Sequence, residues 1–252
     1  MQHRRLTAIA LALITAFGAA ACAGPGSGGD GFVASTSSSP EASAADALMT
    51  AARRLSGEPF TTTVRLAEMS AQGAMDPTGR RARMSIKFRW AGVSADMDVI
   101  LFGESLYVKE DFYARYGGEP NLPAEWMRVD YARINRGSAL DIVSGEGPVG
   151  AGNLMRGLVD VERDGELGFR GTVDLARSLK AYGATTTVVP FTATVDQQGR
   201  LVAFSVDAEK VSWTTGDIRA SYDNLGEPIE VTAPEPAMVV EMPDDRFAVL
   251  NS

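Results

Sequence analysis

Cys22 is the residue of this chain whose chemistry is easiest to assign. It is the only cysteine among the 252 residues, and a lone thiol cannot form a disulfide within its own chain. Three small residues, Ala19, Ala20 and Ala21, come directly before it. Small side chains at such a position are typical of the site at which a signal peptidase cuts. The spacing therefore predicts a signal-peptidase cleavage site next to Cys22.

The residues before Cys22 have the layout of a secretory signal peptide. Arg4 and Arg5 make a basic start, and an apolar run over residues 6–18 follows. This run is shorter than the ~20 residues that a membrane-spanning helix needs. Together with Cys22, the segment resembles a bacterial lipobox in which Ala19 stands where leucine is usual. The resemblance implies that cleavage makes Cys22 the first residue of the mature chain and that its thiol carries a lipid such as palmitate. One alternative stays open, because an ordinary A-x-A cleavage would release a secreted protein that merely contains a cysteine.

Side chains suited to catalysis are scarce after the predicted cleavage site. The only histidine is His3, which lies in the predicted signal peptide. The mature chain therefore lacks the partners of serine–histidine and cysteine–histidine nucleophiles, and it lacks imidazole ligands for a metal. Two carboxylate pairs remain, Asp96 with Asp98 and Asp244 with Asp245, and solvated surface charge explains both. We expect no enzymatic activity, no cofactor and no metal.

The composition restricts the partners. A formal net charge of −8 disfavours nucleic acid and broad docking on anionic lipid surfaces. Hydrophobic residues make up 45% of the chain and charged residues 22%, as in an ordinary globular domain. No second apolar run approaches transmembrane length, so membrane attachment is expected through Cys22 alone. The predicted location is the extracytoplasmic face of the cell membrane.

The chain divides into four predicted parts. They are a signal peptide over residues 1–21, a lipidated N-terminus with a flexible tether over 22–43, a folded domain over 44–236 and a loosely docked C-terminal tail over 237–252. The tether is rich in Gly, Ser and Ala and reaches roughly 25 Å. Order begins where Ser43 and Asp46 fit a capping box, which predicts a helix over residues 44–56 that ends at Gly57.

The pattern then changes to period two. Residues 81–90 and 93–101 alternate apolar and polar side chains around a two-residue turn at 91–92. The predicted cross-strand pairs are Trp90 with Val93, Phe88 with Ala95, Ile86 with Met97, Met84 with Val99 and, on the other face, Lys87 with Asp96. A second turn at 103–104 adds a strand, and residues 60–68 come before. The result is a predicted four-strand antiparallel meander with one apolar face.

The remaining elements have shorter patterns. Further strands are predicted over residues 125–130, 169–173, 189–195, 202–206 and 218–222, and the last strand holds Ile229 and Val231. The turn at 198–199 pairs Val195 with Val202, Ala193 with Phe204 and Phe191 with Val206. Short helices are predicted over residues 154–159 and after Asp174, which can cap its helix. Residues 111–124 form an aromatic loop in this scheme, and Pro236 ends the sheet.

Three segments resemble the actinobacterial LppX/LprG-type lipoproteins, which are related in fold to the LolA lipoprotein carriers. Residues 100–108 resemble that family's strand–turn–strand, residues 125–130 its tryptophan strand, and residues 222–234 its closing segment, with Leu225 where tryptophan is frequent. The resemblance implies an α+β fold in which a strongly curved antiparallel half-barrel of about ten strands wraps around a few helices. It also implies a cell-envelope lipoprotein that binds acylated lipid or glycolipid for transport or presentation.

The predicted ligand site is an apolar cavity on the concave face of the sheet. Its expected lining is Met84, Ile86, Phe88, Met97, Val99, Leu101, Phe191 and Phe204. One alternative is that helices fill this face, so that these residues only pack the core. Another is a non-enzymatic sensor or chaperone of the same fold, which would bind an envelope protein through the loop over residues 111–124 and the C-terminal tail. A monomer is expected in either case.

Overall fold

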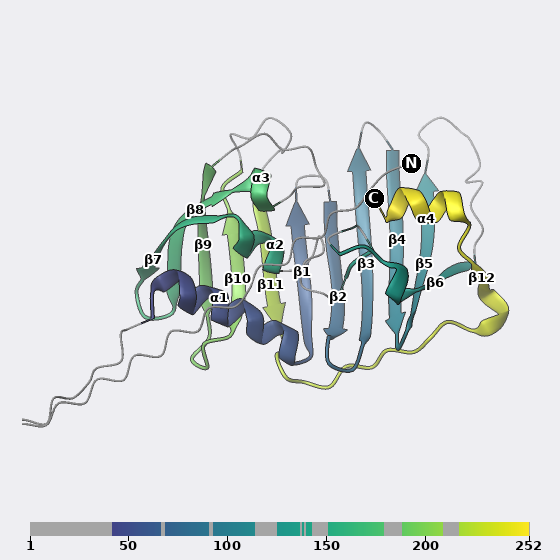
Figure 1. The fold of residues 1–252 in the computed structure, drawn as a ribbon, viewed down its shortest axis with the longest axis horizontal. Coiled ribbons are helices and arrows are strands. Elements are labelled where there is room, and N and C mark those ends of the chain that lie inside the picture. Colours follow the sequence, from purple (N-terminus) through teal and green to yellow (C-terminus); the bar gives the residue numbers. More distant parts are fainter. Residues whose placement is uncertain are drawn as a thin grey trace, which may run out of the picture. The chain divides into compact units, whose positions relative to one another are not determined.

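Most of the described chain belongs to one large β-sheet (Figure 1). The computed structural model describes residues 42–66, 69–90, 93–113, 125–136, 138, 140–142, 151–178, 188–208 and 217–251. The strands of these residues are β1 (Phe60–Leu66), β2 (Met69–Asp76), β3 (Arg81–Trp90), β4 (Val93–Phe102), β5 (Ser105–Tyr113), β6 (Trp126–Asp130), β7 (Leu158–Asp164), β8 (Gly168–Asp174), β9 (Val188–Val195), β10 (Leu201–Val206), β11 (Ile218–Asp223) and β12 (Val239–Glu241). All twelve of these described strands lie in a single sheet.

The strand order shows how the chain builds this sheet. It reads β12-β6-β5-β4-β3-β2-β1-β11-β10-β9-β8-β7. Strands β1 to β6 are antiparallel neighbours in chain order. The next strand, β7, lies at the opposite edge of the sheet, and β8 to β11 follow in order until β11 pairs with β1. The segment after β11 runs back along the sheet to place β12 parallel to β6 (Figure 1). The sheet is therefore open and curved, and almost entirely antiparallel.

The helices lie on one face of this sheet (Figure 1). They are α1 (Ala44–Arg54), α2 (Ala151–Arg156), α3 (Leu175–Ser178) and α4 (Asp244–Leu250), with the 3-10 turns η1 (Leu55–Gly57), η2 (Tyr131–Arg133) and η4 (Pro236–Met238). We name the sheet face that carries them the inner face and the opposite one the outer face. The predicted α+β fold is confirmed as one large, open, curved sheet with few helices, although the described residues supply twelve strands instead of about ten.

The first helix forms for the predicted reason. The Ser43 hydroxyl accepts a hydrogen bond from the Asp46 amide at 3.1 Å, which satisfies one of the free amide groups of the first turn. Leu48 and Ala51 are buried against the sheet. The helix is α-helical only to Arg54 and then tightens into the 3-10 turn of η1. The predicted end at Gly57 is therefore confirmed in position, while the last turn differs in type.

Alternation sets the register of the first strands. The predicted pairs between β3 and β4 are all confirmed, including Phe88 with Ala95 and Lys87 with Asp96. The next turn also pairs Leu101 with Leu106, as the pattern predicts. A slip by one residue would carry the apolar side chains that now lie on the inner face to the outer face, and the free-energy cost of exposing them fixes the pairing.

Besides β12, described below, two strands were not predicted from the sequence. β2 lies between β1 and β3, so the predicted four-strand meander lacks one of its members. Its inner positions between Met69 and Met75 are the small residues Ala71 and Gly73, which give little hydrophobic signal. Gly73 is required there, because a Cβ atom would lie 2.2 Å from the carbonyl oxygen of Arg83 in β3. β7 is the second, since its first residues Leu158 and Val159 were assigned to the short helix that ends as α2 at Arg156.

The second meander differs from the prediction by one residue. Val195 pairs with Leu201 and not with Val202, because β10 has an irregular register between Leu201 and Ala203. The other predicted pairs are confirmed, since Phe204 lies opposite Ala193 and Val206 opposite Phe191 in the same ladder. The irregularity puts Leu201, which is fully buried, on the inner face.

The C-terminal residues are part of the fold. Ile229 and Val231 do not form the predicted last strand, and β12 is that strand instead. Prediction of a loosely docked tail after Met238 is wrong. The Asn251 side chain accepts a hydrogen bond from the Asn135 amide at 2.7 Å, and its backbone carbonyl accepts one from the Asn135 side chain at 2.8 Å. Met242 is buried in the core.

An ionic network joins the end of α1 to the β9–β10 hairpin. Arg200 donates to Asp196 at 2.7 Å and to Glu58 at 3.4 Å, and Arg54 donates to the carbonyl of Gln198. Burial acts to raise the pKa of Asp196, but hydrogen bonds from Arg200 and from the Gln198 amide outweigh it and hold this pKa below its ordinary value. The network therefore keeps Asp196 charged.

Candidate ligand-binding site

The structure brings the predicted lining residues to the inner face in two groups. The first group lies on β3 and β4, where Met84 faces Val99 and Ile86 faces Met97, with Phe88 and Leu101 on the same face. Phe191 on β9 and Phe204 on β10 form the second group, and their rings stack with centroids 5.0 Å apart and 9° between the planes. In the strand order, β2, β1 and β11 separate the groups.

All of these side chains except Phe88 are buried in one hydrophobic core. Met84, Val99 and Leu101 are each 0% exposed, so the centre of the inner face is covered. Large apolar residues in such positions stabilise the fold whether or not a ligand binds.

The inner face is less completely covered at one end of its central strands. Leu66 of β1 pairs with Met69 of β2, and Met69 pairs with Phe88 of β3, so the three side chains form one row across the sheet. Each is only partly buried and packs on the core, while Ile218 beside Leu66 and Ala95 beside Phe88 are buried. We name Leu66, Met69 and Phe88 the apolar rim. Sequence reasoning named Phe88 alone, because the other two lie on the strand that it missed or at the end of β1.

The described helical cover of the inner face comes in two parts (Figure 1). α1, α2 and α3 lie over the half of the sheet that ends in β7, and α4 lies over β4 and β5. Phe247 and Leu250 of α4 pack against the same hydrophobic core as Leu48 of α1. Leu140 and Ile142, from a segment without helix, are also buried in this core.

A buried ion pair joins α4 to the inner face. Glu110 of β5 lies opposite Met97, and its side chain is 4% exposed. Arg246 of α4 donates to its Oε2 atom from Nε at 2.6 Å and from Nη2 at 2.5 Å. The pair attaches α4 to the sheet beside the first group of lining residues.

Tyr222 of β11 is the second polar group of interest on the inner face. It is 1% exposed, and within the described part of the chain its hydroxyl has no hydrogen-bond partner. Its ring meets Phe60 edge to face, with centroids 5.8 Å apart. Burial raises the pKa of Tyr222 and keeps its hydroxyl protonated.

Replacing Tyr222 with phenylalanine should raise the free energy of unfolding by about 1 kcal/mol. A buried hydroxyl without a partner loses its hydrogen bonds to water on folding, and no hydrogen bond in the protein offsets that loss. Urea unfolding followed by circular dichroism would measure the change. The matched control is Tyr107→Phe on the outer face, for which we expect a change within about 0.5 kcal/mol. A loss of stability in the Tyr222 variant would contradict the assignment of an unsatisfied hydroxyl.

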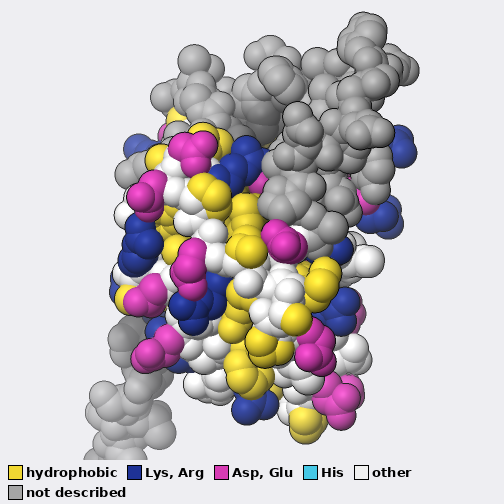
Figure 2. Space-filling model, turned by 90° about the vertical axis from the view of Figure 1, so that its right-hand side faces the viewer, with side chains coloured by type: hydrophobic (Ala, Val, Ile, Leu, Met, Phe, Trp, Pro, Cys, Tyr) yellow, Lys and Arg dark blue, Asp and Glu magenta, His cyan; other side chains and the backbone are white. Residues whose placement is uncertain are grey.

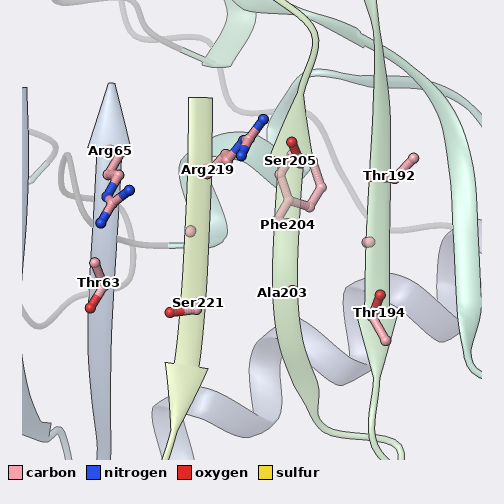
Figure 3. A pocket seen from close by; sticks show the side chains of 11 residues that line it. Thr63, Arg65, Thr192, Thr194, Ala203, Phe204, Ser205, Arg219 and Ser221 are labelled. Carbon is pink, nitrogen blue, oxygen red and sulfur yellow. The ribbon is translucent and has the colours of Figure 1, made fainter. Parts of the chain in front are cut away.

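The outer face is polar and hollowed. One hollow of about 390 Å³ lies across β9, β10, β11 and β1 (Figure 3). A second hollow of about 570 Å³ continues from β1 to β4. A third of about 320 Å³ lies at the start of β9 and the end of β10. Short side chains such as Thr63, Thr194 and Ser221 make these hollows possible, because they leave the backbone of the sheet uncovered.

The edge of the sheet at β12 and α4 exposes hydrophobic side chains. Figure 2 shows them as a band between Lys or Arg and Asp or Glu side chains on this side of the molecule. Met238, next to β12, is 45% exposed, and Val249 of α4 is 63% exposed. Such a patch is typical of a surface that contacts another molecule.

Other kinds of site have no support among the described residues. Within the ranges given above, no group of three or more His, Cys, Asp or Glu side chains could hold a metal ion. The described helices also include none with the length and apolar character needed to cross a membrane. Residues 1–41, which include Cys22, the predicted signal peptide and most of the predicted tether, lie outside the described residues. So do residues 114–124 of the predicted loop, while residues 111–113 extend β5.

Comparison with known proteins gives a structural likeness but no match in sequence. No family model matches the chain, and no curated protein matches its sequence. The crystal structure of the lipoprotein LppX from Mycobacterium tuberculosis superposes with a TM-score of 0.38 and 14% identity, over 75% of this chain and 98% of that one. Values this low do not assign the chain to a family or a function.

Proposed function

We propose that this protein is an exported, lipid-anchored protein of the cell envelope that binds the acyl chains of a lipid or glycolipid on the inner face of its sheet. The observation that carries the proposal is the apolar rim. Leu66, Met69 and Phe88 lie side by side and remain partly exposed, next to a face that is otherwise apolar. An acyl chain that covers them gains about 0.8 kcal/mol for each CH₂ group that it buries.

The chemistry of the neighbouring residues supports the same ligand. Met84 and Met97 follow the rim along β3 and β4, and methionine side chains adapt their shape to irregular apolar partners. The charge of Glu110 is neutralised by Arg246, so no unpaired carboxylate faces this region from β5. The proposed contact surface is therefore the apolar rim, and the seven other residues predicted from the sequence belong to the buried core on which the rim packs.

The anchor belongs to the same proposal. Lipid on Cys22 would hold the domain at the extracytoplasmic face of the membrane, and the tether over residues 22–43 would let it approach neighbouring lipids. Such a protein would work as a monomer, and it would transport or present its ligand without chemical change.

Native mass spectrometry and solvent extraction of the protein purified from its own membrane would test the proposal. We expect a fraction of molecules to carry one bound acylated lipid in addition to the lipid on Cys22. A homogeneous protein without such a ligand, which also fails to take up added phospholipid or fatty acid, would overturn it.

A pair of variants in one strand locates the site. Met69→Asp puts a charge into the apolar rim and should lower lipid affinity at least tenfold, since a carboxylate beside an acyl chain loses its hydration. Ser70→Asp puts the same charge on the outer face of the same strand and should leave the affinity unchanged. Fluorescent fatty-acid titration measures both. Equal affinities of the two variants would exclude the rim as the site.

The patch at the β12 edge favours a second candidate, a protein-binding sensor or chaperone that uses Met238 and Val249 (Figure 2). This function predicts a lipid-free protein that crosslinks to one envelope protein in cells. The Val249→Asp variant would lose that crosslink, whereas a lipid carrier would keep its ligand after the same change.

A further inference from the structure

The hollow across β9, β10, β11 and β1 has a regular build. Register places Thr194, Ala203, Ser221 and Thr63 in one row across the four strands of the outer face. Figure 3 shows this row of short side chains, with the longer Arg219 and Arg65 in the next row along the strands. The short row forms the floor of a hollow of about 390 Å³, a size that suits a small ligand.

The two arginines form an unusual pair. Arg65 of β1 and Arg219 of β11 are directly opposite each other on the outer face. Like charges in this position destabilise a sheet. Arg219 donates to Asp217 at 2.6 Å, while Arg65 has neither a hydrogen bond nor an ion pair with any residue in the described part of the chain. The pair therefore leaves one guanidinium unneutralised, in a chain whose net charge is −8.

An oxyanion would complete this arrangement. Guanidinium groups bind phosphate through two parallel hydrogen bonds, and a phosphate dianion between two of them removes their repulsion. The hydroxyls of Thr63, Ser221 and Thr194 both donate and accept, which suits the hydroxyl groups of a sugar or other polyol. The lining has no aromatic ring on the outer face on which a nucleobase would stack, since Phe204 is buried toward the inner face.

We propose that this hollow is a second binding site, for a phosphorylated sugar or polyol. The phosphate lies between Arg65 and Arg219, and the hydroxyl groups of the ligand lie along the row of Thr63, Ser221 and Thr194. The neighbouring hollow shares Thr192 and Ser205 with this one and brings Asp217, whose carboxylate accepts hydrogen bonds from further hydroxyls. The site is on the opposite face from the apolar rim, so it does not depend on lipid binding.

Isothermal titration with glucose 1-phosphate, glucose and inorganic phosphate tests this site. We expect glucose 1-phosphate to bind at least tenfold more tightly than either of the others, with an affinity that falls as salt is added. Arg65→Gln should weaken binding at least tenfold. Ser221→Ala should weaken the sugar phosphate but not inorganic phosphate.

The control is Arg89→Gln, which removes an exposed arginine from the outer face at the end of β3. It changes the net charge by the same amount and should leave binding unchanged. Equal weakening by Arg89→Gln, equal affinity for inorganic phosphate (an adventitious ion only) or no saturable binding would each overturn the proposal. Arg65 and Arg89 are exposed, so both variants should keep the melting temperature of the wild type, or raise it slightly for Arg65→Gln as repulsion is lost.

Discussion

Replacing Arg246 with alanine should lower the free energy of unfolding by about 3–5 kcal/mol, because it leaves the carboxylate of Glu110 buried without a counter-charge. Glu110 is 4% exposed on the inner face, and Arg246 is its partner from α4. The loss cannot exceed the free energy that holds α4 and β12 on the sheet. In the variant this segment can detach, and water then solvates the carboxylate of Glu110. Urea unfolding measures the total loss, and limited proteolysis after Met242 reports detachment.

The double variant Glu110→Leu with Arg246→Leu is the matched control. It removes both charges, and apolar replacements of a buried ion pair are often neutral or stabilising. We expect it to recover most of the stability that Arg246→Ala loses. A loss below about 1 kcal/mol in the single variant would mean that α4 is not held by this pair.

Replacing Phe204 with alanine should cost about 3–5 kcal/mol of the free energy of unfolding. Phe204 is 1% exposed and stacks on Phe191, so the change removes a large buried ring and leaves a cavity beside its partner. The matched control is Phe102→Ala. Phe102 is 39% exposed on the outer face, where its ring lies under Arg81, and its loss should cost about 1 kcal/mol or less.

The Phe204 variant also separates packing from binding. If Phe204 contacts a bound acyl chain, Phe204→Ala should lower the lipid affinity as well as the stability. Fluorescent fatty-acid titration, at a temperature at which the variant is folded, measures this affinity. Unchanged affinity would assign Phe204 to the core alone. A stability loss similar to that of Phe102→Ala would contradict its burial.

Elements with a strong local signal were predictable. The helix of α1 follows from a capping serine and a helical apolar stripe, and both are local in sequence. The β3–β4 hairpin follows from strict alternation over residues 81–90 and 93–99 on the two sides of a two-residue turn, which leaves only one register that brings the two apolar faces together. The predicted lining residues share one face for the same reason.

Elements whose signal depends on distant neighbours were missed. β2 has Ala71 and Gly73 at inner positions, because β3 approaches too closely for a larger side chain at Gly73. The register of β10 against β9 shifts between Leu201 and Ala203, and the side-chain pattern along β10 alone does not show this shift. α4 and β12 are short, so their side-chain patterns alone do not predict them. Their partners, Glu110 for α4 and β6 for β12, lie far away in the chain.

By itself, the sequence determined the start of the folded domain and the one-sided apolar character of its strands, because each depends on residues close together in the chain. The lipid site at Cys22 stays a prediction. Only the tertiary structure decided which strands become neighbours. That choice joins Leu66, Met69 and Phe88 into the apolar rim and sets Arg65 opposite Arg219 on the other face. Both arrangements arise from pairing between strands, and a side-chain pattern read along one strand does not contain its partner.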